Sequence, residues 1–124
     1  MTPTEAAWLA GFIDGEGTIY HVMAKGRYSQ WKLSVGNTHF PSIEYCQRIA
    51  GGIGTVQRYE RSADPPAART TKLGWSEKRK PFLSWRVTTW ADTVSLCRQM
   101  LPYLITKREL AQRCIDENAA LEIH

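Results

Sequence analysis

The stretch Leu9-Ala10-Gly11-Phe12-Ile13-Asp14-Gly15-Glu16-Gly17 ends an apolar, helix-favouring segment with two carboxylates that alternate with glycines. Thr4 is the predicted N-cap of a helix that runs through Asp14, and the glycines at 15 and 17 are predicted to end it. The residues that follow change from helical to alternating periodicity. This stretch therefore marks the passage from a helix to a strand, and it carries the most distinctive residues of the chain.

One face of the predicted helix is almost free of side chains. Ala7, Gly11 and Gly15 recur every four residues, and Ala10 lies beside them. A glycine inside a helix costs about 1 kcal/mol relative to alanine, so closer packing must offset that cost. Such a row lets a second helix approach closely, and the same helix in a twofold-related copy is the expected partner. Tight packing of the row on the chain's own sheet is the alternative.

Two acids follow on the same helix, at the end where the backbone dipole is already negative. This placement disfavours Asp14 and Glu16 by about a few tenths of a kcal/mol unless a cation or hydrogen-bond donors compensate. A divalent metal ion would compensate, and Asp14 can instead accept backbone N–H groups that follow the helix. Glu16 lies between two glycines that permit close approach of a ligand, so it is the favoured metal ligand.

The composition is that of one compact domain. The chain has 124 residues, of which 43% are hydrophobic, and this is enough for one core over residues 1–124. Its three cysteines have neither the spacing of a zinc site nor the density of a disulfide-rich secreted protein, so we expect a reduced, intracellular protein. We expect no membrane span and no signal peptide. A bacterial cytoplasm and an organelle matrix are equally compatible with the sequence.

Positive charge is concentrated in the middle of the chain. Residues 18 to 90 hold 12 Lys and Arg against 4 Asp and Glu, whereas residues 1 to 17 hold three acids and no base. A basic surface in one part of a fold favours a polyanionic partner, with nucleic acid ahead of a membrane because no basic amphipathic helix is present. An ordinary solvated basic face is the alternative.

Hydrophobic periodicity predicts the remaining elements. Strands are expected at 18–24, 28–37, 53–61 and 82–88, and helices at 41–50, 91–101 and 104–121. Residues 62–80 lack sustained periodicity, which indicates a long loop or an extended hairpin tip. The predicted order is α-β-β-α-β-β-α-α. In two of the strands, alternation directs these side chains inward: Trp31, Leu33, Val35, Leu83, Trp85 and Val87.

Residues 9–17 closely resemble the nine-residue signature of the LAGLIDADG homing endonucleases, and the element order matches that family's domain. The segments 36–38, 51–54 and 102–107 are also similar to family landmarks. The resemblance implies an α+β fold, αββαββα, with a four-stranded antiparallel DNA-binding sheet in each subunit. Because this chain has one motif, it also implies a homodimer through the first helix, at Ala7, Ala10, Gly11, Asp14 and Gly15.

The activity that the resemblance implies is that of a site-specific homing endonuclease. Such an enzyme makes a double-strand break in a long, partly palindromic DNA site and leaves short 3′ overhangs, using Mg²⁺, which Mn²⁺ can replace. Glu16 stands where the family places its metal-binding Asp, with the carbonyl of Gly15 as a further ligand. Lys107 matches the family's basic residue near the scissile phosphate, and Asn37, or its neighbours Gly36 and Thr38, matches a polar residue that positions water.

Ordinary roles for two of these residues stay open. Lys107 can be a solvated helix residue, and Asn37 can belong to the turn that starts the helix at 41–50. Two other functions of the same fold also stay open: a DNA-binding regulator that does not cut, and an RNA maturase that helps an intron to fold.

Strand alternation, together with the resemblance, predicts which side chains face double-stranded DNA in the major groove. The predicted set is the polar side of the strands and the neighbouring bases: Thr18, Tyr20, Lys25, Arg27, Tyr28, Gln30, Lys32, Ser34, Gln57, Tyr59, Arg61, Lys72, Ser84 and Arg86. Of these, the loop bases Lys25, Arg27 and Lys72 are expected to contact phosphates.

Overall fold

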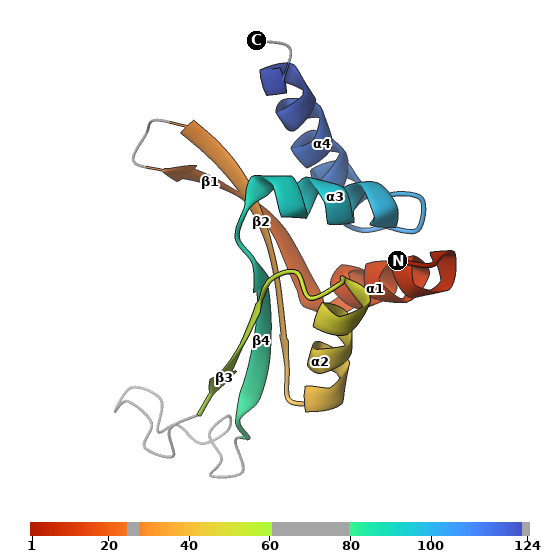
Figure 1. Ribbon diagram of the computed structural model, residues 1–124, viewed down its shortest axis with the longest axis vertical. Helices are drawn as coiled ribbons and strands as arrows, with labels where there is room; N and C mark the ends of the chain where they lie inside the picture. The colour runs from red at the N-terminus through yellow and green to blue at the C-terminus, as the bar shows by residue number, and fades with distance from the viewer. Residues whose placement is uncertain (25–27, 61–79, 123–124) are drawn as a thin grey trace, which may run out of the picture.

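The computed structural model describes residues 1–24, 28–60 and 80–122. Its four strands form one antiparallel sheet, and its helices cover one face of that sheet (Figure 1). The α+β class and the predicted order of elements are confirmed. The helices and strands are α1 Pro3–Glu16, β1 Gly17–Ala24, β2 Tyr28–Asn37, α2 Phe40–Ile49, β3 Thr55–Tyr59, β4 Phe82–Val87, α3 Trp90–Met100 and α4 Arg108–Glu122.

Helix α1 begins two residues earlier than its sequence pattern suggested, and it ends two residues later. The N-cap is Thr2 instead of Thr4: the Thr2 side chain accepts the N–H of Glu5, and the Glu5 carboxylate accepts the N–H of Thr2. This reciprocal pair satisfies two of the N–H groups that the first turn leaves without a helical partner. At the other end, the helix continues to Glu16, with Gly17 as the C-cap.

Two further elements differ from prediction by more than one residue. Helix α4 begins at Arg108 instead of residue 104. Residues 101–107 form a turn region in which the N–H of Leu104 bonds Met100, and the N–H groups of Ile105 and Lys107 bond Asp14 of α1. Strand β3 covers only Thr55–Tyr59, and its start follows Gly54, whose φ of +84° is a left-handed conformation that interrupts extended backbone.

The sheet has the order β1-β2-β4-β3. Val35 on β2 lies opposite Gly17 on β1 and opposite Trp85 on β4, so these three positions share one face. The residues predicted to point inward from β2 and β4 are all buried, which confirms the predicted faces of these strands.

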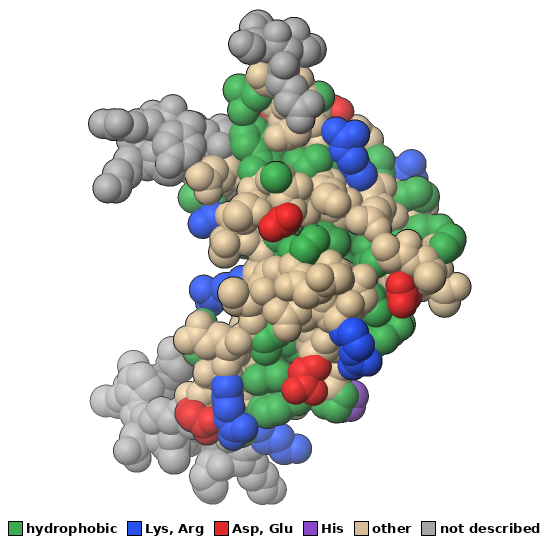
Figure 2. Space-filling view, viewed as in Figure 1, with side chains coloured by type: hydrophobic (Ala, Val, Ile, Leu, Met, Phe, Trp, Pro, Cys, Tyr) green, Lys and Arg blue, Asp and Glu red, His purple; other side chains and the backbone are tan. Residues whose placement is uncertain are grey.

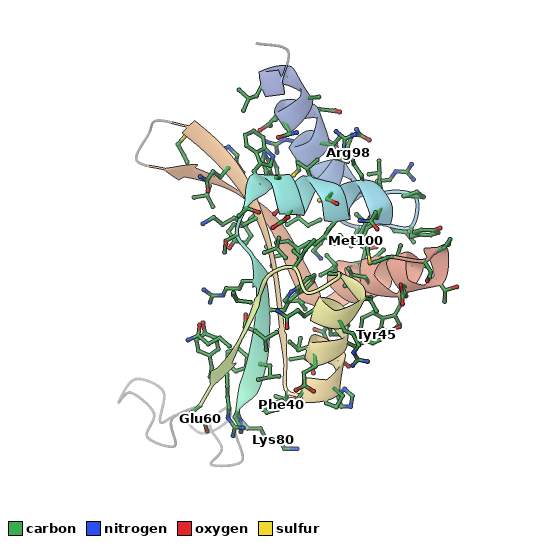
Figure 3. All side chains as sticks on the ribbon, in the orientation of Figure 1. Phe40, Tyr45, Glu60, Lys80, Arg98 and Met100 are labelled. Carbon is green, nitrogen blue, oxygen red and sulfur yellow. The ribbon has the colours of Figure 1, made fainter. Side chains whose placement is uncertain are left out.

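The core lies between this inward face and the helices. Leu9 and Ile13 of α1, Ile43 of α2 and Leu96 and Met100 of α3 are fully buried against it. Figure 3 shows Met100 within the helical layer. Helix α4 packs chiefly on α3, with further contacts to β1. The three cysteines are free and buried, and none of the helices in the described ranges has the length and apolar character needed to cross a membrane.

Candidate active site and nucleic-acid interface

The end of α1 is joined to the turn before α4 through Asp14. One oxygen of its carboxylate, Oδ2, accepts the backbone N–H of Ile105 at 2.7 Å, and the other, Oδ1, accepts the backbone N–H of Lys107 at 2.9 Å. The ammonium Nζ of Lys107 donates in return to the backbone carbonyl of Asp14 at 2.8 Å. Of the two roles that the sequence left open for Asp14, its hydrogen bonds fit the acceptor of backbone N–H groups. The donors come from residues 91 and 93 positions away instead of from the residues that follow the helix.

Glu16 is the last residue of α1, and its side chain is exposed. Within the part of the chain that the structure describes, its carboxylate accepts no hydrogen bond and forms no ion pair. The next residue, Gly17, has little room for a side chain, because an added Cβ would lie 2.8 Å from Cδ1 of Ile13. The helix passes directly into β1, and no described residue engages the Glu16 carboxylate.

Oxygen donors at this position suit Mg²⁺, which binds one or two carboxylates and completes its shell with water or phosphate oxygens. The Gly15 carbonyl is one of the last four of α1, which lack helical partners, so it is a further donor of the same kind. Among residues 1–24, 28–60 and 80–122, no three His, Cys, Asp or Glu side chains gather into a site that could hold a metal ion alone. An ion at Glu16 would therefore be held by that carboxylate and the Gly15 carbonyl among the described residues, with water or phosphate oxygens to complete its shell.

Asn37 has a local role in the structure. Its Oδ1 accepts the backbone N–H of His39 at 2.8 Å, in the turn that leads into α2. It shares the helix-covered side of β2 with Val35, whereas Gly36 faces the other side. In the described chain no hydrogen bond joins Asn37 to Glu16 or Lys107, so its catalytic role stays a prediction.

The open face is the side of the sheet opposite the helices, and the predicted DNA-facing residues of the described strands lie on it. Ser34 lies opposite both Thr18 and Arg86, and Lys32 lies opposite Tyr20, so their side chains share this face. On the described strands the exposed members are Thr18, Gln57 and Arg86, and the half-buried members are Tyr20, Gln30, Lys32, Ser34 and Tyr59. Figure 2 shows that the molecule is hollowed along its left edge, and Lys and Arg side chains are among those that lie along this edge.

Ser84 is a correction to the predicted set. It lies on the open face, but it is only 7% exposed. Its strand is an inner one, so Ser84 has Gly36 on one side and Gln57 on the other. A short hydroxyl side chain in that position is covered by its neighbours, and it leaves the set of candidate DNA contacts.

Thr55 and Phe82 belong to the open face and were not predicted there. Thr55 is exposed opposite Arg86, and the ring of Phe82 stacks on that of Tyr59 with centroids 5.1 Å apart. The guanidinium of Arg86 lies 5.7 Å from the centre of the Tyr59 ring. Strand alternation alone would have placed Thr55 and Phe82 on the open face. Phe82 is apolar, however, and an apolar residue is expected in the core.

Lys25, Arg27, Arg61 and Lys72 lie outside the described residues. Tyr28 is described at its register position opposite Ala24, and its side chain is not.

The small-residue row of α1, Ala7, Gly11 and Gly15, faces outward. All three are exposed, and a Cβ added at either glycine would meet no atom within 4 Å. The alternative in which the row packs on the chain's own sheet is therefore wrong. Ala10 is a correction, because it is fully buried in the core.

Exposed apolar side chains lie near the row. Trp8, on the same helix, is 37% exposed and stacks on Phe12 with ring centroids 5.1 Å apart. The Trp8 ring also meets the ring of Tyr45 of α2 edge-on, with centroids 4.8 Å apart. Ile105, whose N–H bonds Asp14, is 84% exposed.

Three solved structures are similar to this fold. I-CvuI, a homing endonuclease solved in complex with its target in the presence of Ca, matches with a TM-score of 0.64 and 24% identity over 92% of this chain and 65% of its own. The LAGLIDADG homing endonuclease I-SmaMI, solved bound to cleaved DNA, matches with a TM-score of 0.59 and 17% identity over 98% of this chain and 38% of its own. The chain has the LAGLIDADG homing-endonuclease fold.

The archaeal intron-encoded homing endonuclease I-Vdi141I, complexed with DNA, has the same LAGLIDADG fold. It matches with a TM-score of 0.59 and 12% identity over 94% of this chain and 67% of its own. This chain therefore spans about two-thirds of the I-CvuI chain and less than half of the I-SmaMI chain. No protein-family profile matches the sequence, and no curated protein matches it significantly.

Proposed function

We propose that the protein is a site-specific, Mg²⁺-dependent DNA endonuclease that acts as a homodimer. The observation that carries this proposal is the placement of two opposite charges, on Glu16 and Lys107, at the end of α1. The Glu16 carboxylate is exposed and free of partners within the described residues, and the ammonium of Lys107 is fixed to the carbonyl of Asp14, two residues before Glu16. A carboxylate and an ammonium at one helix end suit a metal ion and a phosphate that bind together.

Double-stranded DNA is the substrate that the open face favours. Arg86 and Lys32 can read guanine edges, and Gln30 and Gln57 can read adenine edges, in a major groove laid along the hollow. Lys25, Arg27 and Lys72 would contact phosphates, and Arg61 would join the residues that read base edges. The net charge of +4 favours a polyanion, and its effect will weaken as salt concentration rises.

The small-residue row supports dimerisation. Two copies of α1 that cross at Ala7, Gly11 and Gly15 can approach until their backbones are in contact. This crossing would cover Trp8 and bring both Glu16 side chains near the twofold axis. Asp14 lies beside this row, half-buried. A twofold protein reads a partly palindromic site, and two Glu16 sites near the axis would cut one bond on each strand.

The chemistry is hydrolysis of a phosphodiester. Water attacks phosphorus, the bond to the 3′-oxygen breaks, and the products are a 3′-hydroxyl and a 5′-phosphate. Bound Mg²⁺, or Mn²⁺ in its place, supplies Lewis-acid stabilisation and a water of lowered pKa. Glu16 and the Gly15 carbonyl would hold that ion, and Lys107 would neutralise charge on the phosphate. Short 3′ overhangs and intron homing complete the proposal.

The test is a selection from a randomised duplex library with purified protein and Mg²⁺, in which cleaved ends and bound, uncut DNA are recovered separately. We expect cleaved ends around one partly palindromic site. Glu16→Gln should bind that site without cutting it, whereas Glu44→Gln removes the same charge from the exposed surface of α2 and should cut normally.

Three results would overturn parts of this proposal. Cutting by Glu16→Gln would remove Glu16 from the reaction. Specific binding without cutting by the wild-type protein would indicate a regulator, and preferential binding of intron RNA would indicate a maturase.

A further inference from the structure

Asp14 and Lys107 hold each other through both side chain and backbone. The carboxylate of Asp14 accepts the backbone N–H of Lys107, and the ammonium of Lys107 donates to the backbone carbonyl of Asp14. The second carboxylate oxygen accepts the N–H of Ile105, so both oxygens have donors. We call this set of three hydrogen bonds the Asp14–Lys107 clamp.

The clamp compensates the negative end of the α1 dipole and bonds one of its unpaired carbonyls. The last four carbonyls of a helix have no helical partner, and their negative end favours a cation. Gly17 N–H bonds the carbonyl of Ile13, and the Lys107 ammonium bonds the next one, that of Asp14. The two backbone N–H groups that Asp14 accepts offset its own negative charge at this unfavourable place.

The clamp also fixes a side chain that is otherwise flexible. A lysine ammonium stands at the end of a four-carbon stem with large rotamer freedom. Here the backbone of Lys107 is tied to Asp14, its carbonyl accepts the N–H of Ala111 in the first turn of α4, and its ammonium is tied back to α1. One of three ammonium donors is used, which leaves two for a phosphate.

We propose that Asp14 is a positioning residue: it holds the Lys107 ammonium at the Glu16 end of α1, and it acts on the reaction only through Lys107. This inference rests on the proposed function for the role of Lys107 at the phosphate. The two acids of the motif then have different roles. Asp14 positions Lys107, because backbone donors engage both of its oxygens, and Glu16, exposed and unengaged in the described chain, is left to bind the metal ion.

The decisive experiment is a double-mutant cycle on the selected duplex. Single-turnover cleavage rates and DNA affinity are measured for wild type, Asp14→Asn, Lys107→Ala and the double variant. Asn keeps one acceptor oxygen but turns an N–H group toward the other donor, so the clamp loosens while the side-chain size is kept. Asp116→Asn, an exposed acid on α4 that accepts from Gln112, is the charge-matched control.

We expect Asp14→Asn to lower the cleavage rate roughly a hundredfold, as a displacement of about 1 Å can do, with little change in DNA affinity. The double variant should cut at the rate of Lys107→Ala alone. Losses that multiply in the double variant would overturn the inference, because Asp14 would then act independently of Lys107.

Amide hydrogen exchange tests the positioning without any cleavage. The N–H groups of Ile105 and Lys107 should be protected in the wild type and should lose protection in Asp14→Asn, while Asp116→Asn keeps it. Unchanged protection would overturn the clamp. A wild-type protein that cuts no duplex would overturn the endonuclease and the catalytic part of this inference together, and the exchange rates would then decide the positioning part alone.

Discussion

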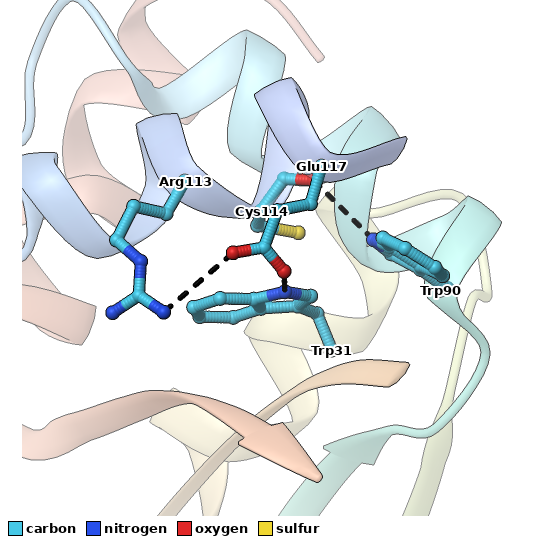
Figure 4. A network of polar contacts seen from close by, with 5 residues as sticks. All are labelled: Trp31, Trp90, Arg113, Cys114 and Glu117. Atoms are coloured by element: carbon cyan, nitrogen blue, oxygen red, sulfur yellow. Dashed lines mark hydrogen bonds and ion pairs between the residues drawn. The ribbon is translucent and has the colours of Figure 1, made fainter. Parts of the chain in front are cut away.

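The indole Nε1 of Trp31 on β2 donates a 2.9 Å hydrogen bond to Oε1 of Glu117 on α4 (Figure 4). Trp31 is fully buried, and the guanidinium of Arg113 lies 5.2 Å from its ring centre. The other carboxylate oxygen of Glu117 is 3.6 Å from that guanidinium. The last helix is thus tied to the sheet by a polar contact as well as by apolar packing.

Removing this acceptor should destabilise the fold. Glu117→Ala leaves the buried indole N–H without a partner, which costs about 1–3 kcal/mol of unfolding free energy. Glu117→Gln keeps an acceptor oxygen and should cost less. Urea denaturation followed by tryptophan fluorescence measures both, and equal losses in the two variants would show that the hydrogen bond has no part in the effect.

Gly54 should be the most sensitive of the positive-φ glycines. An added Cβ would lie 2.6 Å from Nε1 of Trp85 and 2.7 Å from the carbonyl of Arg86, at a φ of +84°. Gly52 has a similar φ of +86° and nothing within 4 Å. Gly52→Ala should therefore cost only the backbone strain of about 1–2 kcal/mol, and Gly54→Ala clearly more. Thermal unfolding of the pair separates strain from clash.

Gly11→Leu should block dimerisation and leave the subunit folded. The position is open in the single chain, and leucine favours a helix more than glycine does, so the subunit gains helix propensity. Sedimentation at micromolar concentration should show a dimer for the wild type and a monomer for the variant. Ala120→Leu, at an exposed position on α4, is the control and should stay dimeric. A wild-type monomer that cuts both strands would refute the interface.

Arg86→Ala should weaken binding of the selected duplex by about 1–3 kcal/mol and relax specificity at two symmetric base pairs. Arg86 is exposed on the open face beside the ring of Tyr59. Arg98→Ala removes an equal charge from α3, in the helical layer (Figure 3), and should leave base preference unchanged. Affinity measured against single-base variants of the site tests both substitutions.

Stability should decline in alkaline solution partly through Cys46. Burial raises the pKa of this thiol to about 12, whereas an unfolded thiol titrates near 8.5. The folded chain keeps the proton, so the contribution is complete below about pH 8.5 and is lost as pH rises toward the folded value, by up to about 1.4 kcal/mol per pH unit. Cys46→Val should show a shallower decline than wild type in denaturation between pH 8 and 10.

The strand faces could be predicted because alternation is a local property. Trp31, Leu33 and Val35 follow one another at every second position, and the same rule places Arg86 and Gln57 outward. Exposure depends on neighbours across the sheet, however, so alternation could not show that Ser84 is covered. Ala10 was misassigned for a similar reason, since its place on the buried side of α1 depends on how the helix is oriented on the core.

The site could be predicted only in part. The motif around Glu16 is contiguous, and its acids and glycines are visible in the sequence. The bonds from Asp14 to Ile105 and Lys107 join residues more than 90 positions apart, and no local pattern records such a pairing. They also tie Ile105 and Lys107, which precede α4, to the end of α1.

The order of strands has a consequence for the nascent chain. Strand β4 lies between β2 and β3, although both precede it in synthesis. Until Phe82–Val87 has been made, β2 has a partner only in β1, and β3 has no neighbour in the described sheet. The edges of β2 and β3 that β4 will cover then keep unpaired N–H and C=O groups, and such edges pair readily with other chains. A translation product that stops before Phe82 should therefore aggregate, and one that includes β4 can form the complete four-stranded sheet.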